Sequence, residues 1–136
     1  MRNVVTALVA ILVTGCAGSP IWVLTQSPEE LQYVALEDLC NANPYIMSQP
    51  RAPNIHNELR RRDIFSPEEL RAVIDQRVFV GMTRRAATCA LGPPNDINRT
   101  VTAVGEREQL VYRQIGYRRT RVYVYIEAGV VTGYQD

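Results

Sequence analysis

The sequence contains no lysine. All 15 of its basic residues are arginine, and it has a single histidine, His56. The sequence therefore lacks most of the lysine and histidine residues that Schiff-base, acid–base and triad mechanisms use. It also contains neither a nucleophile elbow nor a glycine-rich phosphate loop. His56 has no second histidine one helical turn away, so the pattern does not favour zinc. We expect no catalytic residue, no metal and no cofactor, and we expect His56 to lie on the surface of a helix.

The chain also lacks an apolar run long enough to cross a membrane. At the N-terminus, Arg2 precedes the apolar residues 4–13, which only Thr6 interrupts, and small residues follow up to Cys16. A membrane-spanning helix needs about 20 apolar residues, so this order is typical of a removed export signal. We expect residues 1–15 to be a signal peptide.

The four residues Val13-Thr14-Gly15-Cys16 resemble the lipobox of bacterial lipoproteins, in which the cysteine is acylated and becomes the first mature residue. The alternative is an ordinary secretory signal with an incidental cysteine. Two or three acyl chains hold a protein stably at a membrane. In lipoproteins of two-membrane bacteria, Ala17 and Gly18 in place of an aspartate imply the outer membrane. The resemblance predicts lipidation at Cys16 and an anchor in the inner leaflet of that membrane, facing the periplasm.

Once Cys16 is assigned to lipid, Cys40 and Cys89 remain as a pair. In an oxidising compartment a disulfide bond between them would persist. The alternative is two buried free thiols, since cysteine often acts as a small hydrophobic residue. The sequence gives no distance between the two residues, so both alternatives stay open.

Neither sign of charge predominates. Removal of the signal takes away Arg2 and leaves equal numbers of basic and acidic side chains, which disfavours nucleic acid as a partner. Two arginine clusters each have two possible explanations. They could contact anionic lipid or an acidic partner. They could instead be solvated surface residues, which in the first cluster would pair with Glu58 and Asp63. The clusters are Arg60, Arg61 and Arg62, and Arg118, Arg119 and Arg121. With the second cluster, Tyr123 and Tyr125 form a candidate binding patch, and cross-strand packing explains these tyrosines equally well.

Helix signals dominate the first half of the mature chain. Residues 16–27 are expected to form a tether, although residues 21–24 are apolar enough either to pack on the domain or to place Trp22 at the membrane interface. Capping boxes at Ser27 and Ser66 predict helix starts. The expected helical segment spans residues 28–77, with helices at 28–40, 55–61 and from 67, and a loop at 41–53.

A short helix and a sheet are expected to follow. Thr83 and Gly92 predict a helix over residues 84–91. Extended segments then alternate with turns, which predicts strands at 100–104, 109–115, 121–127 and 130–134. In the third strand we expect Tyr123 and Tyr125 on one face, and Val122, Val124 and Ile126 on the face that packs on helices. The expected fold class is α+β, with N-terminal helices, a short helix, and a three- to four-stranded antiparallel sheet packed against helices.

Residues from about 79 to 136 resemble the SmpA/OmlA (BamE-like) family of small outer-membrane lipoproteins. The matching motifs are Gly81-Met82-Thr83, Leu91-Gly92-Pro93-Pro94, residues 109–112 and residues 123–131. The resemblance implies an α+β domain over 78–136 and a non-catalytic accessory role in outer-membrane β-barrel assembly. The matched residues are turn formers and core residues, so they imply a fold and identify no contact surface.

These observations together predict a membrane-anchored envelope lipoprotein that binds or scaffolds another envelope protein and is not an enzyme. One alternative is a ligand-binding or inhibitory lipoprotein, including an exclusion factor of a mobile element. Another is a hydrolase whose site the sequence does not reveal.

Overall fold

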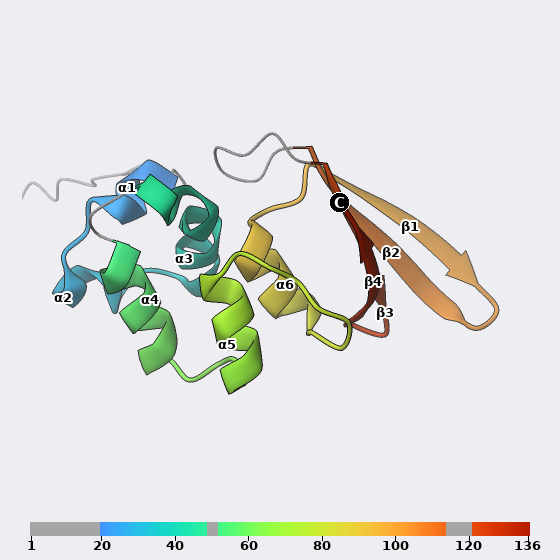
Figure 1. The fold of residues 1–136 in the computed structure, drawn as a ribbon, viewed down its shortest axis with the longest axis horizontal. Coiled ribbons are helices and arrows are strands. Elements are labelled where there is room, and N and C mark those ends of the chain that lie inside the picture. The colour runs from blue at the N-terminus through green and yellow to red at the C-terminus, as the bar shows by residue number, and fades with distance from the viewer. Residues whose placement is uncertain (1–19, 49–51, 114–120) are drawn as a thin grey trace, which may run out of the picture.

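The computed structural model describes residues 20–48, 52–113 and 121–136 (Figure 1). The expected signal peptide and the expected lipidation site Cys16 lie outside the described residues, as do Arg118 and Arg119 of the expected binding patch. In the described residues, helices occupy the N-terminal part and an antiparallel sheet the C-terminal part, which confirms the α+β class.

The N-terminal helices begin where the sequence places capping serines. Ser27 and Ser66 each accept a hydrogen bond from the backbone of the glutamate three residues later, and that glutamate accepts one from the serine N–H. Both predicted helix starts are confirmed. The helices are α1 (Pro20–Leu24), α2 (Pro28–Leu31), α3 (Leu36–Ala42), the 3-10 helix η1 (Asn43–Ser48), α4 (Ala52–Arg61), α5 (Pro67–Ile74) and α6 (Arg84–Leu91).

The single helix expected over 28–40 is wrong, because the chain turns between α2 and α3. Arg62, just beyond α4, donates from Nη2 to the carbonyl oxygens of Leu31 at 3.0 Å and Val34 at 2.6 Å. These bonds satisfy carbonyl groups at the end of α2 that a continuing helix would have used. The expected loop at 41–53 is also partly wrong, since it contains the last two residues of α3, all of η1 and the first two residues of α4.

Part of the expected tether is folded. Residues 20–24 form α1, which packs against α3 (Figure 1). Val23 is only 2% exposed and belongs to the core, whereas Ile21 and Trp22 are 72% and 42% exposed. The short apolar run is therefore divided between the core and the surface.

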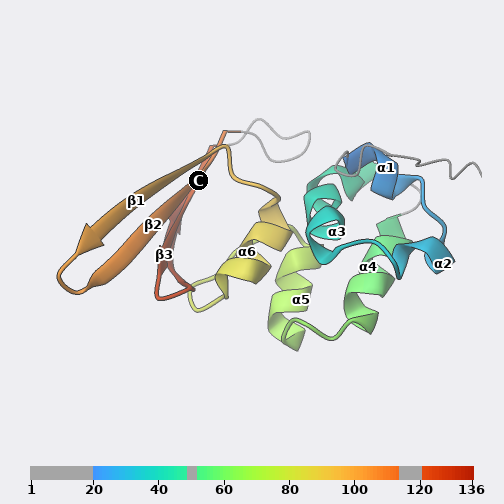
Figure 2. The ribbon, with the colours of Figure 1, turned by 180° about the vertical axis from the view of Figure 1, so that it is seen from behind.

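Helix α6 lies between the other helices and the sheet (Figures 1 and 2). Its predicted ends are confirmed, because Thr83 Oγ1 accepts from the N–H of Ala86 at 3.2 Å and Gly92 follows at φ 83°. Small side chains let α6 approach its neighbours closely on both sides. Its buried residues are Ala86, Ala87, Cys89, Ala90 and Leu91.

The sheet has the order β1-β2-β3-β4, and all neighbours are antiparallel. Its strands are β1 (Asp96–Thr102), β2 (Gly105–Tyr112), β3 (Val122–Glu127) and β4 (Val130–Gln135). The expected first strand at 100–104 is misplaced: β1 starts at Asp96, residues 103–104 form the turn, and Gly105 already belongs to β2. Asp96 and Asn98 are poor strand formers, which concealed the start of this strand from the sequence.

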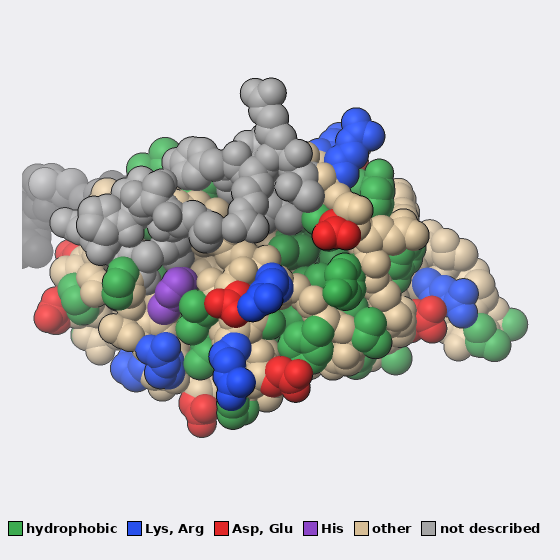
Figure 3. Space-filling view, viewed as in Figure 1, with side chains coloured by type: hydrophobic (Ala, Val, Ile, Leu, Met, Phe, Trp, Pro, Cys, Tyr) green, Lys and Arg blue, Asp and Glu red, His purple; other side chains and the backbone are tan. Residues whose placement is uncertain are grey.

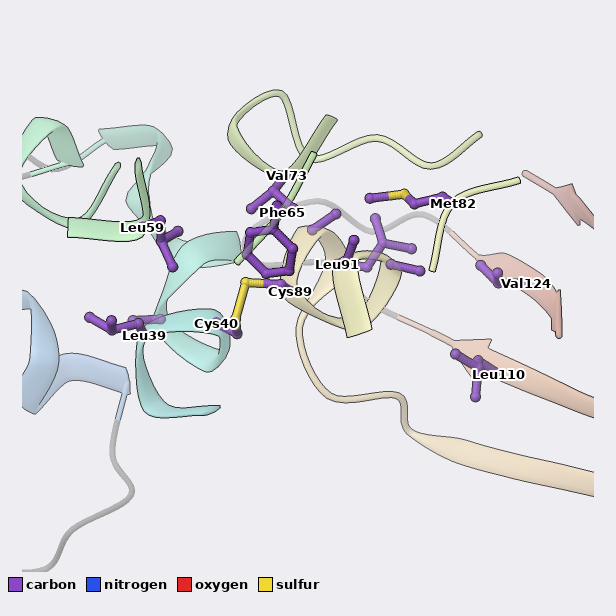
Figure 4. Close-up of a cluster of buried hydrophobic side chains, with 14 of the residues drawn as sticks. Leu39, Cys40, Leu59, Phe65, Val73, Met82, Cys89, Leu91, Leu110 and Val124 are labelled. Carbon is purple, nitrogen blue, oxygen red and sulfur yellow. A yellow bond between two sulfur atoms is a disulfide. The ribbon is translucent and has the colours of Figure 1, made fainter. Parts of the chain in front are cut away.

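The two faces of β3 differ as expected. Val122, Val124 and Ile126 are buried on the helix side, and Tyr123 and Tyr125 are half-buried on the other. Val124 and its β2 neighbour Leu110 point towards the layer of α6, as Figure 4 shows. The buried residues of the N-terminal helices and of the sheet form one continuous core.

Two features join α3 to the neighbouring helices. The sulfur atoms of Cys40 and Cys89 are within bonding distance of each other (Figure 4). Close by, the fully buried Asn43 donates from Nδ2 to the carbonyl oxygens of Val73 at 2.8 Å and Cys89 at 3.0 Å. Its Oδ1 lies 3.3 Å from Nε2 of His56. His56 is thus half-buried on α4: it contacts Asn43, and Figure 3 shows the histidine side chain at the surface of the molecule.

Candidate interaction site

The β1–β2 hairpin, residues 96–112, projects beyond the helices (Figures 1 and 2). Every residue of β1 is exposed, and β2 becomes buried only towards its C-terminal end. The base of the hairpin packs on the helical layer, where Leu110 and Tyr112 are buried. Its outer part, around the turn at 103–104, therefore presents both strands to solvent.

Strand β1 is an edge of the described sheet, with β2 as its only strand neighbour there. An edge strand offers backbone N–H and C=O groups on its outer side for pairing with another extended chain. Proteins usually protect such edges with charged side chains, proline or a bulge. Strand β1 contains no proline and pairs with β2 in an unbroken register, and its charged residues are Asp96 at its start and Arg99. Its β-branched residues favour an extended conformation, and they are Ile97, Thr100, Val101 and Thr102.

A cleft of about 680 Å³ lies between the hairpin, the start of α6 and the β3–β4 turn. Its charged side chains are paired. The carboxylate of Glu108 accepts from Nε of Arg84 at 2.6 Å and from Nε of Arg99 at 3.1 Å. The hydrogen bond from Arg84 is the main cause that lowers the pKa of Glu108; the Arg84 charge and Arg99 lower it further, and burial opposes them. Glu108 therefore stays ionised at neutral pH and is unsuited to act as a general acid.

Aliphatic side chains surround this ion-paired cleft. Val104, which lines the cleft at the turn, is 88% exposed, and Val101 on β1 is 80% exposed. In Figure 3, hydrophobic side chains gather at the far end of the hairpin beside a basic and an acidic side chain. Exposed aliphatic residues next to oriented charges are a common feature of protein-binding surfaces.

The tyrosines of the expected binding patch lie on the opposite face of the sheet from this cleft. The Tyr125 hydroxyl accepts from Nε2 of Gln109 at 3.1 Å and donates to Oε1 of Gln135 at 3.2 Å, so it links β2, β3 and β4. This arrangement favours the cross-strand explanation for Tyr125. Tyr123 is half-buried, and Arg121 is exposed just before β3.

The arginines of the other cluster bond to neighbouring groups of the protein itself, although Arg60 and Arg61 are exposed. Arg61 and Arg62 both pair with Glu58, at 2.8 Å and 2.7 Å, and Arg60 donates to Oδ1 of Asn57 at 2.8 Å. The hydrogen bond from Arg61, joined by Arg62 and opposed by burial, lowers the pKa of Glu58 to about 2. For Arg61 and Arg62, pairing with Glu58 therefore favours the explanation of paired surface residues over contact with lipid or an acidic partner.

The hairpin cleft was not anticipated from the sequence. The sequence feature that could have revealed this cleft is the segment 105–109, in which charged or polar side chains occupy both faces of a strand. A strand in which neither face is apolar cannot be covered by a helix along that part of its length. That pattern distinguishes the projecting end of β2 from the packed end.

Neither a metal cluster nor a membrane span is present in the part of the chain that the structure describes. No group of three or more His, Cys, Asp or Glu residues there is placed to hold a metal ion. Nor is any helix within residues 20–48, 52–113 and 121–136 long and apolar enough to cross a membrane. Comparison with protein-family models, curated proteins and solved structures finds no match to the chain.

Proposed function

We propose that the protein is an envelope lipoprotein, anchored through Cys16, that binds another envelope protein through the β1–β2 hairpin and performs no reaction. The observation that carries this proposal is the exposed edge of β1, with Val101 and Val104 beside an ion-paired cleft. The charged groups in the cleft neutralise one another, so they suit recognition better than chemistry.

The mode of binding follows from the geometry of an edge strand. An extended segment of the partner would pair with the backbone of β1, and main-chain hydrogen bonds would supply much of the affinity. Alternate side chains of that segment would meet Ile97, Arg99 and Val101, which share one face of β1. The exposed valines favour an apolar residue in the partner, and Arg99 adds charge selectivity.

The envelope part of the proposal rests on the sequence. The predicted export signal and the resemblance of residues 13–16 to a lipobox support acylation of Cys16, and residues 79–136 resemble the SmpA/OmlA family of outer-membrane lipoproteins. That resemblance implies two helices against a three-stranded antiparallel sheet, and the protein has an antiparallel sheet of four strands with the short helix α6 beside it. From this resemblance we propose, more specifically, that the protein has an accessory role in the assembly of outer-membrane β-barrels.

Site-specific photo-crosslinking in the native envelope tests this function. A photoreactive residue at Val101 or Val104 should give an adduct with one envelope protein. The matched control is Tyr33, which is 85% exposed in the turn after α2 at the other end of the molecule. Identical adducts from Tyr33, or none from either valine, would refute the hairpin as the binding site.

The identity of the adduct separates the alternatives. Subunits of the barrel-assembly machinery support the accessory role, and a single soluble target supports an inhibitory lipoprotein. Val101→Asp combined with Val104→Asp should remove the adduct without affecting the fold, because both side chains are exposed. An enzymatic activity that survives in this variant would favour a hydrolase instead.

A further inference from the structure

Helix α1 holds two large apolar side chains at the surface. Ile21 is 72% exposed and Trp22 is 42% exposed, whereas the next residue, Val23, is 2% exposed and sits in the core. The carbonyl of Trp22 accepts from Oγ1 of Thr25 at 2.7 Å and from Nε2 of Gln26 at 3.1 Å. These bonds close the C-terminal end of α1, and α1 itself packs against α3. Burial of Val23 and this packing hold α1 against the body of the protein, so Ile21 and Trp22 are presented outward from a defined position.

The chain length between this pair and Cys16 is short. Four residues separate Cys16 from Ile21, and an extended chain spans at most about 3.6 Å per residue, so the two Cα atoms lie within about 18 Å of each other. A folded domain of about 100 residues has a radius of gyration of about 13 Å and is thus wider than this reach. If acyl chains hold Cys16 at a bilayer, the side of the domain that carries α1 must face the lipid.

The charges around α1 specify which kind of lipid surface fits. Residues 20–42 contain no basic residue, and they contain four acidic ones, namely Glu29, Glu30, Glu37 and Asp38. Arg61 and Arg62 lie beside α2 but are paired with Glu58, so this segment has little to attract an anionic surface. Tryptophan favours the head-group region, because its ring is apolar and its N–H can remain hydrated. The contact should therefore depend on apolar insertion into uncharged lipid.

We infer that Ile21 and Trp22 form a second membrane contact beside the acylated cysteine and insert among the head groups of an uncharged lipid surface. This inference rests on the proposed anchor at Cys16. The hairpin lies at the end of the molecule opposite α1, so the contact directs β1 away from the membrane (Figures 1 and 2). Acyl chains on Cys16 alone limit only the distance between the domain and the membrane. The two contacts together also fix the orientation of the domain relative to the membrane.

The single tryptophan makes the test specific, since all tryptophan emission comes from Trp22. The mature protein purified from membranes is reconstituted into phosphatidylcholine vesicles with or without bromine on the lipid acyl chains near the head group. Brominated lipid should quench Trp22 emission at least about twofold. Unchanged emission in acylated protein would overturn the inference.

Three variants serve as controls for position and for side-chain chemistry. In Trp22→Phe combined with Tyr134→Trp, the reporter moves to a residue of β4 that is 47% exposed, and its emission should not be quenched. Ile21→Asp should reduce the quenching of Trp22 by about half or more, and Val104→Asp should leave it unchanged. Equal quenching of the reporter on β4 would also refute the inference, because it would indicate nonspecific adsorption.

Lipid composition separates this contact from one made by arginines. Replacing about a third of the phosphatidylcholine with phosphatidylglycerol should not increase the quenching. An increase that salt abolishes would assign the membrane contact to basic residues and contradict the inference.

Intact mass of the same sample distinguishes failure of the inference from failure of the anchor. An acylated protein with unquenched Trp22 refutes the inference and leaves the anchor standing. An unacylated mature protein refutes the anchor. In that case, quenching at high vesicle concentration still supports insertion of α1, and its absence overturns it.

Discussion

Cys40 of α3 and Cys89 of α6 lie within bonding distance, at the point where the N-terminal helices meet the helix that carries the sheet. The carbonyl of Cys89 also accepts a hydrogen bond from Asn43, three residues beyond Cys40. A covalent link and a buried polar contact thus coincide at one junction. This junction fixes how the N-terminal helices are placed relative to the hairpin.

Loss of the disulfide should destabilise the protein. A bond between residues separated by 49 positions restricts the unfolded chain, and such bonds typically contribute about 2 to 4 kcal/mol. Cys89→Ala should lower the free energy of unfolding in urea by this amount, and the double variant with Cys40→Ala should be no less stable than the single one. Full labelling of both thiols by an alkylating reagent in protein purified without reductant would instead support two free cysteines.

Stability at acid pH should depend on Glu58. Its pKa is lowered to about 2 in the folded protein from an ordinary value of 4.5, so its stabilising contribution is complete above pH 4.5 and is lost as the pH falls towards 2. The Glu58 side chain is only 6% exposed, and Glu58→Gln should cost about 2 to 3 kcal/mol at pH 7.

The difference between Glu58→Gln and wild type should shrink near pH 2, as measured by urea unfolding at both pH values. Glu68→Gln, at an exposed position in the first turn of α5, is the matched control and should change stability by less than about 0.5 kcal/mol. Equal effects of the two substitutions at pH 7 would contradict the role of Glu58.

Local signals in the sequence predicted much of this fold. The capping serines, the ends of α6 and the alternation along β3 depend on residues a few positions apart, so they can be recognised without a structure. The break between α2 and α3 could not be recognised, because it depends on Arg62, which lies 28 residues beyond Val34. The same holds for Asn43, whose partners lie on three other elements.

The candidate site was harder to predict than the fold. The tyrosine patch was inferred from residue type, but the hydroxyl of Tyr125 is engaged between neighbouring strands. The cleft depends on how far the hairpin extends beyond α6, and this is a tertiary property. The pairing of Arg84 with Glu108, 24 residues apart, has no local signal in the sequence.

Gly92 should tolerate no side chain. It adopts φ 83°, and a Cβ built there would lie 2.8 Å from Cγ of Pro44 in η1. Gly92→Ala should therefore cost about 2 kcal/mol or more, because backbone strain and a steric clash add together. Gly129→Ala separates the two effects, since Gly129 also has a positive φ, 77°, but a Cβ added there would have no neighbouring atom within 4 Å.

Urea unfolding of both alanine variants measures the contribution of the contact with Pro44 as the difference between them. Pro44→Ala should recover part of the loss caused by Gly92→Ala and none of the loss caused by Gly129→Ala. Equal costs for the two glycine substitutions would show that the approach of η1 to α6 is not close enough to constrain the sequence.

The imidazole of His56 should titrate below its ordinary pKa of 6.5. Burial is the main cause that lowers the pKa of His56, the charge of Arg60 lowers it further, and Asp75 acts in the opposite direction. Because the chain has one histidine, an NMR titration follows this group without assignment by mutation. Arg60→Gln should raise the midpoint, and Asp75→Asn should lower it.

The sign of the effect on stability follows from the same shift. A histidine whose pKa is lowered in the folded state binds fewer protons there than in the unfolded chain, so stability is complete above pH 6.5 and decreases as the pH falls towards the folded pKa. His56→Gln should remove the decrease in stability between pH 6.5 and the pKa of His56 in the folded protein. It should leave unchanged the decrease in stability below pH 4.5, which is caused by protonation of Glu58. A midpoint at or above 6.5 would mean that His56 is solvated and that its contact with Asn43 does not persist in solution.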